Sequence, residues 1–168
     1  MFKCNTYIIN PDYLKLGWND EDETVKEVFI PITDEAAIRK IKDKIDSKYV
    51  YGAISLKYDD EILFDISDED DVNWRWDYLL GMIEDFLTDG EAHFYLPTKK
   101  VSIKKVNEES LSFKCGERNI VLPTKAFVEF LSAQVKLFFK SYSKVFEEQK
   151  DEYMRIEKRV QKVMNAIR

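Results

Sequence analysis

The last 45 residues of the chain, from Thr124 onward, contain neither proline nor glycine. Because proline and glycine are the residues that most strongly interrupt a helix, this stretch is predicted to be helical. A single straight helix of this length would span about 67 Å. That is wider than a domain built from 168 residues, so the helix must either break and fold back or protrude.

Residues 126–146 and the residues after them carry different apolar patterns. The first segment is apolar over a broad face, which predicts burial in the core. The second carries a narrow stripe at spacings of three and four, formed by Tyr153, Ile156, Val160, Val163 and Ile167. Such a stripe is typical of a seam between two helices. The seam packs either on the same chain, after a break within residues 141–151, or on a second copy in a homodimer.

The residues before Thr124 alternate between strand-like and helix-like patterns. Runs rich in β-branched and aromatic residues and bounded by turn residues predict strands. These runs are residues 4–10, 26–32, 49–58, 61–67, 91–97, 100–106, 110–115 and 119–123. Apolar residues three or four apart predict helices over residues 34–47 and 71–89. Asp70 or Asp71 would begin the second helix and Gly90 would end it.

Together these patterns predict an α+β fold: an antiparallel sheet of about six strands, two packed helices and a long C-terminal helix. We expect residues 1–146 to form a single globular domain and residues 147–168 to be a helical extension of the same domain. The sequence contains no run of eighteen apolar residues and no secretory signal pattern. We therefore expect a cytoplasmic protein in which Cys4 and Cys115 are free thiols.

Negative charge is concentrated in one part of the chain. Residues 59–91 contain thirteen Asp or Glu and a single basic residue, Arg75, whereas residues 92–168 contain sixteen basic and nine acidic residues. If folding gathers the acidic residues onto one face, that face would repel nucleic acids and anionic membranes and attract a basic protein. We therefore expect a basic protein partner and neither a nucleic-acid nor a membrane partner.

The stretch SDEDDVNWRWDY, residues 67–78, places four consecutive acidic residues before two tryptophans. Acidic residues stabilise the start of a helix, but only one or two can lie close to its free amides. Trp76 falls on the apolar face of the predicted helix, and Trp74 lies about 200° away and is expected to be exposed. Acidic residues around an exposed aromatic ring are typical of a protein interface. The expected partner-binding residues are Asp59, Asp60, Asp68, Glu69, Asp70, Asp71 and Trp74.

Other kinds of chemistry fit the sequence less well. Residues 65–71 alternate acids as a calcium loop does, but the positions that require Gly and Glu hold Asp70 and Trp76. His93 is the only histidine, which leaves too few ligands for zinc and no second candidate for a catalytic base of this type. We therefore expect no metal, no cofactor and no enzymatic activity. A nucleic-acid site would have to use Lys99, Lys100, Lys104, Lys105, Lys114 and Arg118, which the net charge of -6 disfavours.

The order of elements also suggests a family. The helix WRWDYLLGMIEDFL is followed by G-x-x-x-F-Y-L at residues 90–96, by a predicted meander, and by F-x-x-F-L at residues 127–131. Over residues 50–146 this arrangement resembles the immunity proteins of bacterial polymorphic and contact-dependent toxin systems. The resemblance implies a non-catalytic inhibitor that binds and occludes a cognate toxin domain, often a basic nuclease. The alternative is a homodimeric structural or regulatory module assembled through the C-terminal helix.

Overall fold

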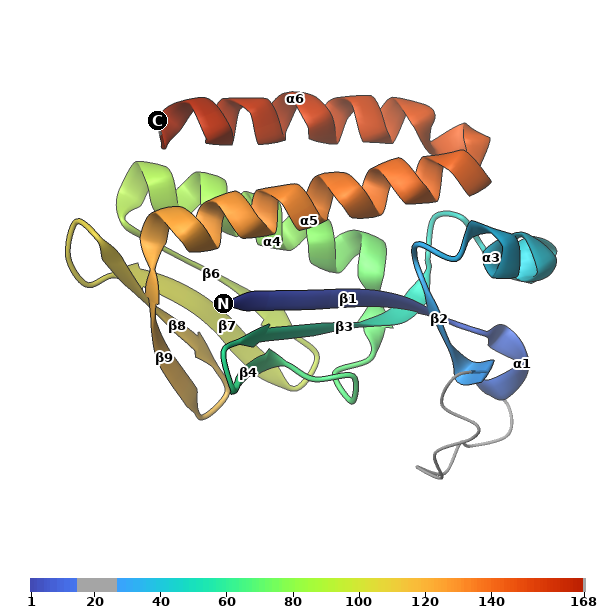
Figure 1. Ribbon diagram of the computed structural model, residues 1–168, viewed down its shortest axis with the longest axis horizontal. Coiled ribbons are helices and arrows are strands. Elements are labelled where there is room, and N and C mark those ends of the chain that lie inside the picture. The colour runs from blue at the N-terminus through green and yellow to red at the C-terminus, as the bar shows by residue number, and fades with distance from the viewer. Residues whose placement is uncertain (15–26, 168) are drawn as a thin grey trace.

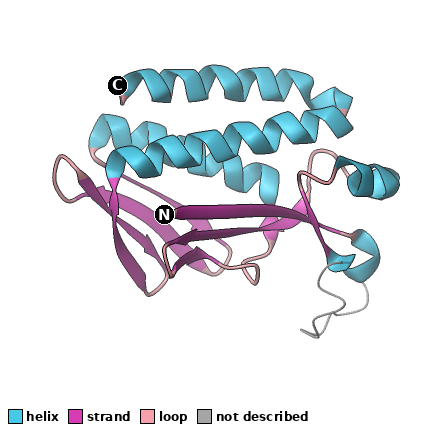
Figure 2. Ribbon diagram, in the orientation of Figure 1, coloured by secondary structure: helices cyan, strands magenta, loops and turns pink. Residues whose placement is uncertain are grey.

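The computed structural model of the protein describes residues 1–14 and 27–167. Of the described residues, 49% are helical and 32% lie in strands, and these strands form two antiparallel sheets on one side of the long helices (Figures 1 and 2). The α+β class predicted from the sequence is therefore confirmed. Residue 26, where the second predicted strand begins, lies outside the described residues.

The first sheet, sheet A, has five strands in the order β2-β1-β3-β4, with β5 also paired to β3. Its strands are β1 (Phe2–Ile9), β2 (Phe29–Pro31), β3 (Tyr51–Tyr58), β4 (Glu61–Phe64) and β5 (Asp70–Asp71). The helical segments that connect them in the described residues include α1 (Pro11–Leu14), α3 (Glu35–Ile41) and the 3-10 turn η1 (Lys42–Lys44). Asp34 caps α3 by accepting a hydrogen bond from the Ala37 amide at 3.0 Å. The helix predicted over residues 34–47 is thus shorter and ends in a 3-10 turn.

The second sheet, sheet B, is a four-stranded meander in sequence order. Its strands are β6 (Glu91–Leu96), β7 (Lys99–Lys105), β8 (Ser110–Cys115) and β9 (Arg118–Pro123). The four strand-like runs between residues 91 and 123 are confirmed as strands by their ladders, in which Phe94 is opposite Val101 and Ile103 is opposite Phe113. These four apolar residues are buried, so the inner face of sheet B belongs to the core.

The strands thus form two sheets, where the sequence pattern predicted one. The 18-residue helix α4 (Val72–Asp89) connects β5 of sheet A to β6 of sheet B. Sheets A and B approach each other at β4 and β8, and Arg118 of β9 donates a hydrogen bond to the carbonyl of Leu63 in β4 at 3.4 Å. The alternation of apolar residues identifies a strand but does not specify which edge it pairs with, which is why the number of sheets was not predictable.

The ends of α4 are those that the sequence predicts. Asp71 is the N-cap residue, and its side chain accepts a hydrogen bond from the Trp74 amide at 3.0 Å. Gly90 ends the helix in the left-handed region, at φ +78°, which a glycine adopts without the steric cost of a Cβ. Trp76 is fully buried and Trp74 is 49% exposed, so the assignment of the two tryptophans to opposite faces is also confirmed.

The proline- and glycine-free segment breaks once and folds back on itself. It forms α5 (Thr124–Val145), the 3-10 turn η2 (Glu147–Gln149) and α6 (Lys150–Ala166). The break comes at Phe146, where ψ is 88°, and α6 then runs back along α5 (Figure 1). The side chain of Phe146 is buried, with its ring 4.6 Å from that of Tyr142, so tertiary packing holds the chain at this point.

The seam of α6 packs on its own chain. Ile156, Val160 and Val163 are buried in the main core, and Tyr153 and Ile167 are partly buried against it. α6 contacts both α4 and α5. Because these side chains are already covered within one chain, we do not propose that a second copy pairs through them. Residues 147–167 therefore form an outer layer of the same domain and do not protrude from it.

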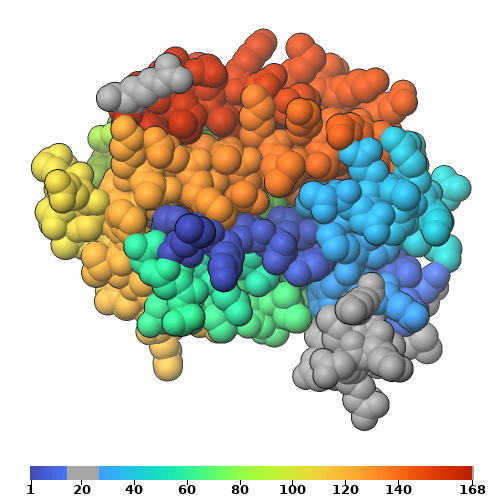
Figure 3. Space-filling view, in the orientation of Figure 1, coloured from blue at the N-terminus to red at the C-terminus, as the bar shows by residue number. Residues whose placement is uncertain are grey.

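Aromatic side chains join the sheets to the helices in the core. Phe64 of sheet A lies 5.6 Å from Phe113 of sheet B, and Phe113 lies 5.9 Å from Phe127 of α5, measured between ring centroids. Phe2 of β1 stacks on Phe130 of α5 at 5.2 Å, and the space-filling view shows β1 directly below α5 (Figure 3).

Of the helices in the described residues, none is both long enough and apolar enough to cross a membrane.

Candidate protein-binding surface

The acidic residues before α4 make contacts within the chain. Asp71 caps the helix, and burial raises the pKa of its carboxyl group, an effect that hydrogen bonds from the first-turn amides oppose. Asp68 is largely buried and forms an ion pair with Lys99 of β7. Glu69 hydrogen-bonds to Tyr51 and contributes to raising the pKa of that phenol, after burial of the ring as the larger cause. Asp68 and Asp71, two of the expected partner-binding residues, are therefore engaged in contacts within the chain.

Asp70 faces a buried cation. The guanidinium of Arg75 is almost completely buried, and its Nη2 lies 3.9 Å from Oδ2 of Asp70. Burial lowers the pKa of Arg75, while the nearby carboxylates of Asp70 and Asp68 oppose this shift. Nε and Nη1 of Arg75 have no hydrogen-bond partner among the described residues. The single basic residue of the acidic window is thus buried close to Asp70 and Asp68, where it compensates part of the local negative charge.

The predicted partner-binding acids do not form one surface. Asp59 and Asp60 follow β3 at one end, whereas Asp70 and Asp71 pair with residues at the other end of that strand. The seven residue steps between Tyr51 and Tyr58 correspond to about 23 Å. The amino group of Met1 also forms an ion pair with Asp59. The two groups of acids are therefore separate, and only the second lies near Trp74.

The exposed side of α4 carries an aromatic pair. Trp74 is 49% exposed and Tyr78, one turn later, is 45% exposed. Their ring centroids are 5.8 Å apart, and the ring of Tyr78 lies 6.0 Å from that of Phe94 in β6. The opposite side of the helix, which includes Trp76 and Leu79, is fully buried. Packing of that side therefore fixes the direction in which Trp74 and Tyr78 point.

A groove of about 280 Å³ lies beside Trp74, between α4 and the start of α6. Its walls combine the Trp74 and Phe139 rings with the carboxylates of Asp77 and Glu152 and with the basic side chains of Lys48 and Arg155. Arg155 spans these carboxylates, with Nη2 3.0 Å from Asp77 Oδ1 and 2.5 Å from Glu152 Oε1. The groove thus offers aromatic and acidic groups to a basic side chain, a role that Arg155 itself fills in the isolated chain.

A second arginine fastens α6 to α4 behind the groove. The guanidinium of Arg159 forms ion pairs with Asp77 and with Glu84, the latter at 2.6 Å. Its hydrogen bonds to Glu84 and Asp77 raise the pKa of Arg159. Asp77 and Glu84 belong to the acidic window, so these contacts further reduce the negative charge that residues 59–91 present to solvent.

Groups suited to catalysis or metal binding are placed apart. Within residues 1–14 and 27–167, no group of three or more His, Cys, Asp or Glu side chains is arranged to hold a metal ion. His93 is exposed on β6, where its ring contacts Tyr95 edge-on. Cys4 and Cys115 are free thiols, as predicted. Burial raises the pKa of Cys4 to about 12 and also raises that of Cys115, so both thiols stay protonated near neutral pH.

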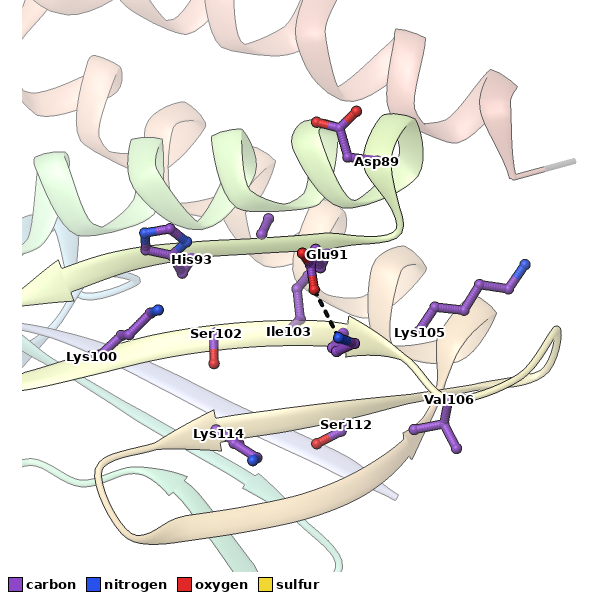
Figure 4. A pocket seen from close by; sticks show the side chains of 12 residues that line it. Asp89, Glu91, His93, Lys100, Ser102, Ile103, Lys105, Val106, Ser112 and Lys114 are labelled. Atoms are coloured by element: carbon purple, nitrogen blue, oxygen red, sulfur yellow. Dashed lines mark ion pairs between the residues drawn. The ribbon is translucent and has the colours of Figure 1, made fainter.

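The structure divides the residues that a nucleic-acid site would have used. Lys99 is paired with Asp68, and the rings of Phe94 and Phe113 are buried in the core. By contrast, Lys100, Lys104 and Lys114 line a hollow on the outer face of sheet B (Figure 4). Alternation along β7 places Lys99 on the same side as the buried Val101 and Ile103, and Lys100 and Lys104 on the other side.

No protein-family model, curated protein or solved structure matches this chain.

Proposed function

We propose that this protein is a non-catalytic binding module that recognises a partner protein through Trp74, Tyr78 and the adjoining groove. The observation that carries the proposal is the exposure of this aromatic pair on a helix whose opposite side is core. Large aromatic side chains held rigidly at the surface are the residues that most often dominate a protein interface. Their fixed position also means that little side-chain freedom is lost on binding.

The groove supports a partner with basic side chains. By displacing Arg155, a lysine or arginine of the partner could place its apolar stem against Phe139 and Trp74 and its charge beside Asp77 and Glu152. Contact between such a cation and the Trp74 ring adds a favourable electrostatic term. In its most specific form, which rests on the resemblance to immunity proteins, the partner is a basic toxin domain that the module occludes.

The test is affinity capture from a lysate of the source organism with the wild-type chain, Trp74→Ala and Leu137→Ala. Leu137 is the matched control, because it is an exposed apolar residue of a long helix, at 41% exposure, and does not line the groove. Loss of a central aromatic anchor costs about 2 kcal/mol or more, or roughly 30-fold in Kd. We expect a basic protein to be recovered with the wild type and Leu137→Ala, and to be lost with Trp74→Ala.

The salt dependence of the association gives a second criterion. Charge pairs in a partly exposed groove are screened as the ionic strength rises, so association should be slower at about 500 mM than at about 50 mM salt. Equal recovery of the same partner with Trp74→Ala and the wild type would overturn the proposal. An acidic partner with no salt dependence would contradict the charge preference that the proposal assigns to the groove.

A further inference from the structure

The outer face of sheet B is a second charged surface. It differs from the Trp74 groove because several lysines line it. The long helices α4, α5 and α6 all lie on the opposite side of this sheet (Figure 2). A hollow of about 620 Å³ extends over its central strands. Six of the residues that line it are His93, Lys100, Ser102, Lys104, Ser112 and Lys114 (Figure 4).

The strand register arranges these residues in rows. His93, Ser102 and Lys114 are cross-strand partners, and in the next row Lys104 is opposite both Glu91 and Ser112. Lys100 and Lys104 lie on the same side of β7, four residues apart, which corresponds to about 13 Å along the strand. The face therefore presents positive charge on two adjacent strands, with hydroxyl groups between the lysines.

Two of these cations are not neutralised within the described part of the chain. Lys104 forms an ion pair with Glu91 at 3.1 Å, drawn as the dashed line in Figure 4. Lys100 lies over the ring of Tyr95, with its Nζ 5.8 Å from the ring centroid, and has no carboxylate partner among the described residues. Lys114 likewise has none within residues 1–14 and 27–167. Lys100 and Lys114 are thus available to an external anion.

Protection of a sheet edge does not account for this placement. Lysines that prevent edge-to-edge aggregation belong on edge strands. Here Lys100, Lys104 and Lys114 lie on β7 and β8, the two central strands of the meander. The edge strand β6 carries Glu91, His93 and Tyr95 on its outward face. Positive charge is therefore concentrated at the middle of an open sheet face in a chain whose net charge is -6.

We propose that the outer face of sheet B is a docking surface for an acidic, extended segment of a partner protein. Lys100 and Lys114 are diagonal neighbours on adjacent strands, a relation that corresponds to about 7–8 Å. In an extended peptide, alternate side chains point to the same side and repeat at about 6.7 Å, so two carboxylates two residues apart can reach both lysines. The hydroxyl groups of Ser102 and Ser112 lie beside the lysines. The Ser102 hydroxyl can bind the peptide backbone, whereas the Ser112 hydroxyl already donates a hydrogen bond to Asn119 Oδ1 at 2.7 Å. This surface is independent of the Trp74 groove and has the opposite charge preference.

A nucleic acid fits the face less well than an acidic peptide does. Binding of a single strand relies on several lysine–phosphate contacts and on aromatic rings that stack the bases. Only Lys100 and Lys114 lack a carboxylate partner on the described part of this face, and the exposed ring of Tyr95 has the Nζ of Lys100 over it, 5.8 Å from the ring centroid. The negative net charge of the whole chain also repels a polyanion more strongly than it repels a short acidic peptide.

The experiment measures binding of three labelled probes by fluorescence anisotropy. The probes are a peptide of alternating Glu and Ser, a neutral peptide of alternating Gln and Ser, and single-stranded oligothymidylate. They are titrated with the wild-type chain, with Lys100→Gln/Lys114→Gln, and with Lys162→Gln. Lys162 is the control because it is an exposed lysine on α6, away from sheet B.

We expect the acidic peptide to bind the wild-type chain and the neutral peptide not to bind. The double variant should weaken binding of the acidic peptide by about 5- to 20-fold, as expected when two exposed charge pairs are lost. Lys162→Gln should leave it unchanged. Tighter binding of oligothymidylate than of the acidic peptide, equal weakening by Lys162→Gln, or failure of the acidic peptide to bind would each overturn the proposal.

Discussion

Substitution of Ile156 by alanine tests how α6 is held to the rest of the domain. Ile156 of α6 is fully buried and belongs to the main core. The change removes three side-chain carbons, and at about 0.8 kcal/mol for each buried methylene the transfer term alone is about 2.4 kcal/mol. The cavity that remains raises the expected loss in the free energy of unfolding to about 3–4 kcal/mol. For a domain of this size, Tm should fall by about 6–15 °C.

The matched control is Met154→Ala, two residues earlier on the exposed side of the same helix. Met154 is 55% exposed, so its replacement should change the free energy of unfolding by less than about 0.5 kcal/mol. Urea denaturation followed by circular dichroism measures both variants. Equal effects of the two substitutions would refute the packing described for α6. A wild-type unfolding midpoint that rises with protein concentration would instead indicate that the seam pairs with a second copy.

Two further predictions concern the capping residue of α4 and the buried thiols. Asp71→Ala removes the side chain that accepts the Trp74 amide, and should lower the free energy of unfolding by about 1 kcal/mol in urea denaturation, whereas Asp71→Asn should retain most of that stability. The pKa of Cys4 rises from 9.0 to about 12 on folding, so the folded state binds this proton more tightly. The contribution of Cys4 to the free energy of unfolding is therefore fully present below pH 9 and is lost as the pH rises toward 12. Cys4→Ser should reduce this loss, which denaturation curves measured across the same pH range would show.

Local chemistry determined the parts of the fold that were predictable from the sequence. Asp71 and Gly90 bound α4 because caps act through neighbouring amides and carbonyls, and the helical period separated Trp74 from Trp76. The length of the segment after Thr124 required that the helix either break or protrude. It did not determine where the break would occur. The break occurs at Phe146, whose side chain is buried by tertiary contacts. Such contacts require neither proline nor glycine, so the sequence carries no local signal for the position of the break.

The acidic surface was not predictable because charge counted along a chain omits partners brought in by folding. Lys99 lies 31 residues from Asp68, and Arg159 lies 82 residues from Asp77, yet each pair is in contact. Similarly, the separation of Asp59 from Asp71 depends on both residues flanking the same strand at opposite ends. Of the predicted partner-binding residues, Trp74 is the one on which the proposed function now rests.

Hydroxyl-radical footprinting of the captured complex tests the proposed binding surface most directly, because it reports the solvent exposure of individual side chains. Trp74 and Tyr78 should be oxidised readily in the isolated chain and become protected when the partner binds. Met154, which is 55% exposed on the neighbouring helix and does not line the groove, is the internal reference and should react equally in both states. Unchanged oxidation of Trp74 and Tyr78 in a complex that protects other residues would contradict the account.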